Sequence, residues 1–127
     1  MTASVFDDPI YGNLFDPGQV ARCFELQAEL DAMLRFETAL AKVEEEAGVI
    51  PKGAAKAIAE AAGTFTPDIA AVAESTRRDG LCIPEFVRQL RKAVGDPYAQ
   101  YVHFGSTSQD VIDTSLVLRL RPALDQI

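Results

Sequence analysis

Apolar residues recur at helical spacing along most of the chain. Between residues 19 and 47 they fall three, four and seven positions apart, which defines one broad apolar face made of Phe24, Leu30, Met33, Leu34, Leu40, Ala41 and Val43. No proline or glycine interrupts this stretch, Gly48 supplies a stop signal, and Pro51 begins the next element. The pattern predicts one long helix over residues 19–47.

Two shorter helices are predicted after it. Residues 51–62 are rich in alanine and are closed by Gly63. The next helix is expected to start at an N-cap, Thr66, with Pro67 in the first helical position, and to run to residue 78.

The last third of the chain is also helical in pattern. One helix should begin at Pro84 and end at Gly95, and a brief helical turn should follow at residues 98–102. Beyond Gly105 the apolar residues form one stripe and a second apolar side, which is typical of a helix inside a bundle. The stripe contains Ile112, Leu116, Leu120, Leu124 and Ile127, and the second side contains Val111, Val117 and Leu118.

The ends of the chain carry two further expectations. Residues 1–18 contain aromatic and aliphatic residues among proline and glycine breakers, which predicts an irregular arm that docks on another surface, with Tyr11 as a packing anchor. No stop signal precedes Ile127, so we expect the last helix to continue in a longer chain or to be covered by oligomerisation. Period-two alternation is absent, and the fold class predicted is all-α.

Composition narrows the possible partners. The 127 residues are 48% hydrophobic and 24% charged, with a net charge of −7, which disfavours nucleic acid and anionic membranes as partners. No apolar run reaches transmembrane length, and the N-terminus lacks the features of a signal peptide, so a cytoplasmic location is expected. Cys23 and Cys82 are interpreted as buried thiols, and a single histidine without a Cys-x-x-Cys pattern disfavours a zinc site.

Acidic residues on the long helix allow two interpretations. Glu37 lies among apolar neighbours and is either a buried, paired carboxylate or a residue at the edge of the exposed face, of which the sequence favours the second. Residues 44–46 are three consecutive glutamates, for which a solvated edge is predicted.

The densest group of polar residues lies just before the last helix, with the sequence His103-Phe104-Gly105-Ser106-Thr107-Ser108-Gln109-Asp110. Two overlapping pairs, Ser106 with Gln109 and Thr107 with Asp110, fit the capping-box pattern of a helix start. One cap needs one hydroxyl, and three are present. The surplus hydroxyls and the free amides of the first turn would suit an anionic ligand, with His103 as a possible additional donor. From the residues alone, anion binding and pure capping are equally supported.

Two adjacent arginines form a second candidate. Arg77 and Arg78 lie near the end of a predicted helix, where cations interact favourably with the helix dipole. They are also able to bind a carboxylate or phosphate bidentately, and this alternative stays open as a possible anion contact.

The polar stretch closely resembles the first conserved region of the fumarase/aspartase superfamily. Thr107, Ser108, Asp110 and Thr114 match its pattern T-S-x-D-x-x-x-T residue by residue. The preceding His103 and Gly105 give the form shared by adenylosuccinate lyases and bacterial 3-carboxy-cis,cis-muconate cycloisomerases. Residues 33–41, 47–51 and 81–84 resemble the cycloisomerase branch, and arginine at position 78 departs from the histidine usual in adenylosuccinate lyases.

The resemblance implies an amino-terminal helical domain over residues 1–105 and the start of a central helical bundle over residues 106–127. It implies a homotetramer whose active sites combine three subunits, a small tricarboxylate substrate, and lactonisation without a metal or cofactor. Thr107 and Ser108 would bind a substrate carboxylate, with Ser106 as a further substrate-binding residue. Gln109 and Asp110 of the same site would orient the loop, and His103 would bind substrate or pack. The family's later catalytic motifs do not occur in this sequence, so the chain alone is expected to be inactive.

Two alternatives remain at this point. The first is an adenylosuccinate lyase or another fumarate-eliminating lyase. The second is a non-catalytic helical interaction module in which residues 106–110 act only as a cap.

Overall fold

A computed structural model describes residue 6, residues 8–15 and residues 18–127. Within these residues the regular secondary structure is entirely helical, which confirms the predicted all-α class. The elements are η2 (Gly12–Phe15), α1 (Gln19–Arg22), α2 (Leu26–Glu46), α3 (Ala54–Thr64), α4 (Ile69–Asp79), α5 (Ile83–Val94), η3 (Ala99–Tyr101) and α6 (Ser108–Leu124).

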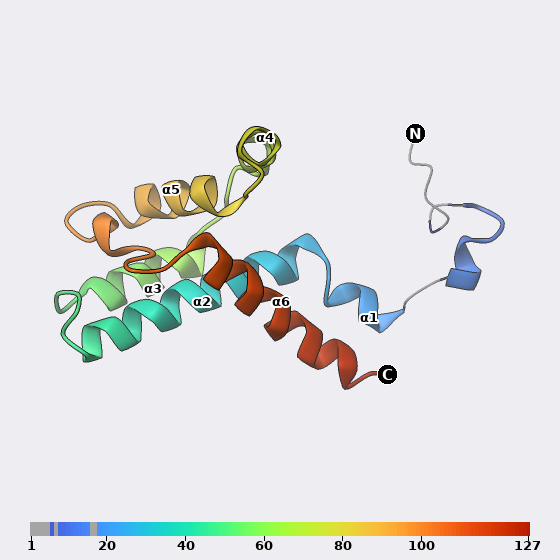
Figure 1. Ribbon diagram of the computed structural model, residues 1–127, viewed down its shortest axis with the longest axis horizontal. Helices are drawn as coiled ribbons and strands as arrows, with labels where there is room; N and C mark the ends of the chain where they lie inside the picture. Colours follow the sequence, from blue (N-terminus) through green and yellow to red (C-terminus); the bar gives the residue numbers. More distant parts are fainter. Residues whose placement is uncertain (1–5, 7, 16–17) are drawn as a thin grey trace.

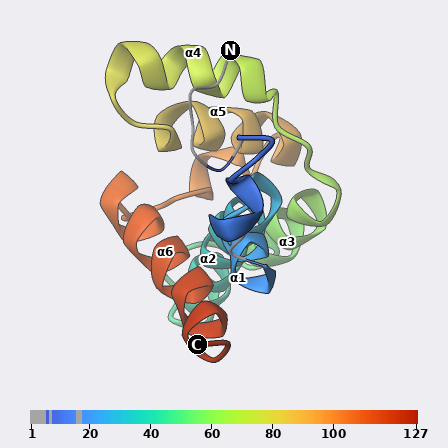
Figure 2. The same ribbon diagram turned by 90° about the vertical axis from the view of Figure 1, so that its right-hand side faces the viewer.

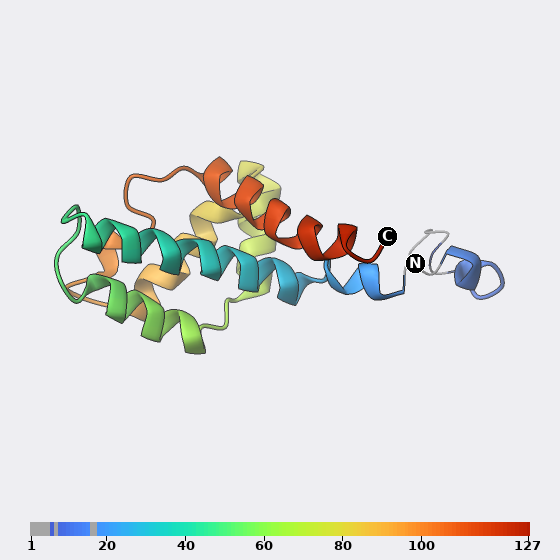
Figure 3. The ribbon, with the colours of Figure 1, turned by 90° about the horizontal axis from the view of Figure 1, so that it is seen from below.

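Helix α2 lies at the centre of the helix packing. Helices α3 and α6 both pack on it and run antiparallel to it, with α6 alongside its amino-terminal half (Figures 1 and 3). Helix α5 packs on α3, and α4 lies across α5 at one end of the molecule (Figure 2). The core lies between these helices and consists mainly of Met33, Ala41, Ile50, Ala54, Ile58, Ile83, Phe86, Val87, Leu90, Val102 and Val111.

Phe86 anchors this core from α5. Its side chain is almost completely buried, and the ring of Phe65 packs edge-on against it with 5.7 Å between the ring centroids. Burying a side chain of this size contributes about 1.5–3 kcal/mol to stability. Pro84 in the first turn and Gly95 as the C-cap bound α5 close to the predicted residues.

The predicted long helix is interrupted. Residues 23–25 belong to neither helix, so α1 and α2 are separate elements. The break accompanies a tertiary contact in which the guanidinium of Arg119 lies 5.9 Å from the centroid of the Phe24 ring. A contact with a distant helix outweighs a few residues of local helix propensity.

The start of α4 also differs from the prediction. Its N-cap is Asp68, whose carboxylate accepts a hydrogen bond of 3.0 Å from the amide of Ala71, and Thr66 and Pro67 precede the helix. A proline biases the residue before it towards extended backbone, and aspartate is the stronger cap. Gly63 lies inside α3 and does not close it.

Helix α6 turns a different face inward than its apolar stripe suggested. The buried residues are Val111, Ser115 and Ala123, whereas Leu116 and Leu124 of the predicted stripe are exposed, Leu124 by 67%. Small side chains allow α6 to approach α2 closely, so the larger residues lie on the side away from α2. Pro122 is accommodated inside the helix near its end.

The amino-terminal arm extends beyond the helices (Figures 1 and 3). Phe6, Ile10, Tyr11 and Leu14 are all exposed, so Tyr11 is not packed within the described chain, and docking of the arm on another surface stays a prediction. Residues 1–5, 7 and 16–17 of the predicted arm lie outside the described residues. Of the helices that the structure describes, none has the length and apolar character needed to span a membrane.

The two cysteines are free and partly buried, in partial agreement with the predicted buried thiols. Burial raises the pKa of the Cys82 thiol, and the negative charge of Glu29 acts in the same direction.

Candidate functional site

The polar stretch forms the start of α6, and Thr107 is its N-cap. The Thr107 hydroxyl lies 3.4 Å from the amide of Asp110, while the Asp110 carboxylate accepts the backbone N–H and the hydroxyl of Thr107, each at 2.8 Å. This reciprocal arrangement is a capping box, as predicted for Thr107 with Asp110. The alternative box of Ser106 with Gln109 does not form. The Ser106 hydroxyl instead lies 3.5 Å from the Asp110 carboxylate, and Gln109 donates to Asp113.

These hydrogen bonds stabilise the charged form of Asp110. The donors of Thr107 lower the pKa of Asp110 below its ordinary value, first the backbone N–H and then the hydroxyl, and Ser106 and the charge of His103 add to the effect. The Asp110 carboxylate therefore stabilises the loop through its hydrogen bonds to Thr107.

Ser108 is the hydroxyl left over. Ser108 occupies the first position of α6 and is half-buried, and its hydroxyl makes no hydrogen bond within the part of the chain that the structure describes. The amides of Ser108 and Gln109 lie in the first turn, where a helix offers no carbonyl partner. One free hydroxyl and two free amides at the positive end of a helix are suited to a carboxylate.

His103 meets a carboxylate from α2. Its Nδ1 lies 2.7 Å from Oε1 of Glu37, whose side chain is 0% exposed, while the His103 side chain is 12% exposed. The prediction that Glu37 sits at an exposed edge is therefore wrong. Its sequence position among apolar residues allowed the buried alternative, but only the fold brings a residue 66 positions later against it.

Two other glutamates differ from the predicted solvated edge. Burial raises the pKa of Glu44, repulsion from Glu37 adds to this, and His103 opposes it. The Glu45 carboxylate accepts the amides of Gly53 and Ala55 at 3.0 and 2.8 Å and so caps α3. Glu37 and Glu44 are seven residues apart on one helix face, a spacing that was visible in the sequence.

The loop between the core and α6 is held at both ends. The Arg91 guanidinium donates two hydrogen bonds, of 3.3 and 3.0 Å, to the carbonyl of Val102, and the capping box fixes Thr107. His103 has a φ of 60°, a left-handed conformation that costs non-glycine residues energy, and Gly105 has a φ of 66°. The contacts on either side of the loop, from Arg91 and from the capping box, thus hold His103 and Gly105 in this left-handed conformation.

Arg77 and Arg78 do not form an obvious anion site. Arg77 binds Glu74 bidentately at 3.1 and 2.7 Å, and Arg78 binds Asp79 with two bonds of 2.8 Å. Both arginines are exposed and each has an acidic partner. Their contact with an anion stays a prediction.

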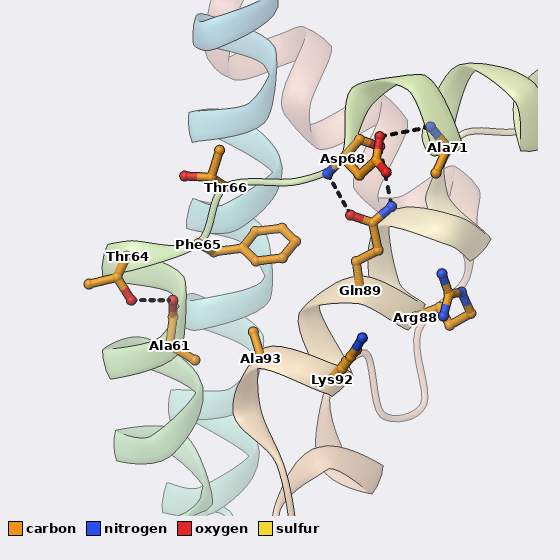
Figure 4. A pocket seen from close by; sticks show the side chains of 10 residues that line it. All are labelled: Ala61, Thr64, Phe65, Thr66, Asp68, Ala71, Arg88, Gln89, Lys92 and Ala93. Carbon is orange, nitrogen blue, oxygen red and sulfur yellow. Dashed lines mark hydrogen bonds between the residues drawn. The ribbon is translucent and has the colours of Figure 1, made fainter.

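A pocket of about 600 Å³ lies away from the polar stretch, between the end of α3, the start of α4 and α5 (Figure 4). Two basic residues line it, Arg88 and Lys92, and Arg88 forms an ion pair with Glu85. Among the described residues no group of three His, Cys, Asp or Glu side chains is placed to hold a metal ion.

Comparison with known proteins agrees with this fold and motif. No protein-family model matches the chain. A 3-carboxy-cis,cis-muconate cycloisomerase from Bradyrhizobium diazoefficiens is 41% identical over 123 residues, covering 94% of this chain and 27% of the relative. An N-acetyl-S-(2-succino)cysteine lyase from Enterococcus italicus is 37% identical over 123 residues, covering 97% of this chain and 27% of the relative. Nitrosuccinate lyase and adenylosuccinate lyase also occur among the relatives.

A solved structure gives the same result. The crystal structure of the β-carboxy-cis,cis-muconate cycloisomerase from Acinetobacter calcoaceticus sp. ADP1 superposes with a TM-score of 0.80 at 39% identity, over 84% of this chain and 26% of that one. The chain is therefore a member of the fumarase/aspartase superfamily of lyases and corresponds to the amino-terminal portion of its enzymes. It spans about a quarter of the length of the relatives it matches.

Proposed function

We propose that this chain is the amino-terminal part of a 3-carboxy-cis,cis-muconate cycloisomerase and that the start of α6 forms the carboxylate-binding wall of its active site. The observation that carries the proposal is the free Ser108 hydroxyl, placed beside a cap that Thr107 and Asp110 already complete. Free first-turn amides occur at every helix start, so the half-buried Ser108 hydroxyl is the feature that capping does not require.

The wall would act by electrostatics. One carboxylate of a tricarboxylic muconate would lie against the Ser108 hydroxyl and the first-turn amides, with Thr107 beside it. A second carboxylate adds across the conjugated double bond, and a proton then adds at the neighbouring carbon to give the lactone. Charge that builds up next to the bound carboxylate is stabilised by donors already in place. No metal or cofactor enters this scheme.

The remaining parts of the site would come from elsewhere in the enzyme. We propose that residues 1–105 form the amino-terminal domain, that residues 106–127 begin the central bundle, and that a cytoplasmic homotetramer assembles the site. Exposed Leu116, Val117 and Leu124 on α6 support burial of this face in a bundle. On this basis the chain alone has no turnover, and carboxymuconate turnover by purified residues 1–127 at the rate of a full-length enzyme would contradict it.

The binding role is tested by Ser108→Ala in the full-length protein. A hydrogen bond to a charged group contributes about 1.5–3 kcal/mol, and each 1.4 kcal/mol is tenfold in affinity, so KM should rise about tenfold or more. Thr107→Val should raise KM and also lower stability. If both variants lose stability but keep substrate affinity, the stretch is only a cap, and the chain is better explained as a helical interaction module.

A lyase that eliminates fumarate is the second candidate. The match to an N-acetyl-S-(2-succino)cysteine lyase covers 97% of the chain, and an adenylosuccinate lyase also matches. Arg78 stands where adenylosuccinate lyases usually have histidine, which favours the cycloisomerase. Assaying the full-length protein side by side with carboxymuconate, adenylosuccinate and the succinocysteine decides between them, because the true substrate should exceed the others in kcat/KM by orders of magnitude.

A further inference from the structure

The buried carboxylate of Glu37 has one oxygen without a hydrogen-bond partner among the described residues. The residue is 1% exposed, Oε1 meets His103, and Oε2 is buried with no hydrogen-bond partner among the residues that the structure describes. Leaving a buried carboxylate oxygen without a partner is unfavourable, and an apolar residue of similar size would pack at less expense in free energy. Stability alone therefore does not explain a glutamate at this position.

The hydrogen bond to Glu37 determines what the His103 ring can offer a ligand. With the Nδ1 proton donated to Oε1, only Nε2 remains to exchange a proton or a hydrogen bond. Nε2 has no hydrogen-bond partner in the described part of the chain, and the ring is not fully covered. His103 lies four residues before Thr107, the N-cap of α6, so its ring belongs to the short loop that leads into the start of α6.

We propose that Glu37 is a positioning residue that holds His103 as the Nδ1–H tautomer and so presents Nε2 to the ligand bound at the start of α6. The role extends the proposed function, on which it rests for the identity of that ligand. The ring itself is fixed from two sides, because the Arg91 hydrogen bonds to the Val102 carbonyl hold the backbone immediately before it. A ring with fixed tautomer and orientation transfers protons more effectively than one that must reorganise.

The tautomer can be read directly, since His103 is the only histidine in the 127 residues. Imidazole ¹H–¹⁵N correlation spectra of the chain, at a pH where the ring is neutral, should show Nδ1 protonated. Glu37→Leu should lose this preference, whereas Glu37→Gln should keep it, because the amide oxygen still accepts from Nδ1. A protonated Nε2 with bare Nδ1 in the unmodified chain, or an unchanged tautomer in Glu37→Leu, overturns the proposal.

Kinetics of the full-length protein test the consequence independently of how the chain alone behaves. Glu37→Leu should lower kcat about 10- to 100-fold while KM changes little, and Glu37→Gln should retain most of the rate. Equal losses in the two variants would mean that charge rather than positioning matters, and would refute the role. Glu29→Leu is the matched control, because Glu29 is another α2 carboxylate with a partner from α6, Arg119 at 3.3 Å, away from the ring.

Failure of this inference and failure of the proposed function give different results. If Ser108→Ala leaves KM unchanged but Glu37→Leu loses the tautomer and the rate, the carboxylate wall is wrong and the role of Glu37 stands. If Ser108→Ala raises KM and Glu37→Leu keeps its rate, the wall stands and Glu37 is only part of the core. Thermal unfolding of both Glu37 variants, expected close to the unmodified protein, excludes loss of folding as the cause.

Discussion

Helices α4 and α6 both begin with a side-chain N-cap, but the polar groups around the two caps differ. At α4, the Asp68 carboxylate caps Ala71, the Asp68 amide donates to Gln89 at 2.7 Å, and the Gln89 amide group donates back to the Asp68 carbonyl at 3.3 Å (Figure 4). Each of these polar groups has a partner. At α6 the cap is equally complete, and within the described part of the chain the Ser108 hydroxyl has no hydrogen-bond partner. The first-turn amides are without partners at both starts, so the two differ at the first helical position, which is Ile69 in α4 and Ser108 in α6.

Under the proposed function, this difference separates the residues that build the helix start from the residue that would bind a ligand. A cap satisfies donors that the helix itself creates, whereas a binding site keeps donors available for a group that arrives later. The resemblance motif spans both kinds of residue, because Thr107 and Asp110 build the loop and Ser108 is left over.

The largest stability effect in this comparison should come from removing each cap in turn. Asp68→Ala and Thr107→Val should each lower the free energy of unfolding by about 1 kcal/mol, as for other N-caps. In the full-length enzyme only Thr107→Val should also weaken substrate affinity. Urea unfolding combined with KM measurements checks both, and a raised KM in Asp68→Ala would remove the distinction between the two starts.

The pH dependence of the α6 start should be smaller. The folded pKa of Asp110 is lower than its unfolded value, so its stabilising contribution is complete above the ordinary aspartate pKa of about 3.9 and is lost as the pH falls through the lowered folded value. Asp110→Asn should remove this dependence and leave the acid limb of the stability curve shallower. An unchanged slope in urea titrations across this range would contradict the hydrogen bonding seen at Thr107.

The smallest effect is expected at the start of α5, where the Glu85 side chain is 13% exposed and that of its partner Arg88 is 65% exposed. Hydrogen bonds from Arg88 and then Gln89 lower the pKa of Glu85 to about 2. Arg88→Ala should return this pKa towards its ordinary value with little change in stability, because Arg88 is exposed and Glu85 keeps its hydrogen bond from Gln89. Carboxyl NMR titration measures it, and a Glu85 that still titrates at about 2 in the variant would assign the shift to Gln89 instead.

Periodicity predicted the class and most of the helices because local sequence decides where a chain can be helical. It did not predict the break at residues 23–25, which accompanies a contact between Phe24 and Arg119 almost a hundred residues apart in sequence. It also misjudged α6, since two apolar sides cannot reveal which one α2 will cover. Burial of one side is a property of the partner helix as much as of the residues.

The site was predicted in the same uneven way. The motif placed Thr107, Ser108 and Asp110 at a helix start, and Thr107 and Asp110 form the predicted capping box. Their binding role stays a prediction. Glu37 was assigned to the surface, because a single glutamate among apolar residues looks like an edge until its histidine partner is known. A pairing across 66 residues leaves no local trace.

The two hydrogen bonds from Arg91 to the Val102 carbonyl would affect how tightly a ligand binds at the start of α6. Arg91 holds one end of the loop by hydrogen bonds and the capping box holds the other. The residues between them therefore have little conformational entropy to lose on binding. A ligand that arrives at a loop already in its bound shape binds without an entropic penalty for ordering it. Arg91, which by this geometry need never touch the ligand, would then influence how tightly it is held.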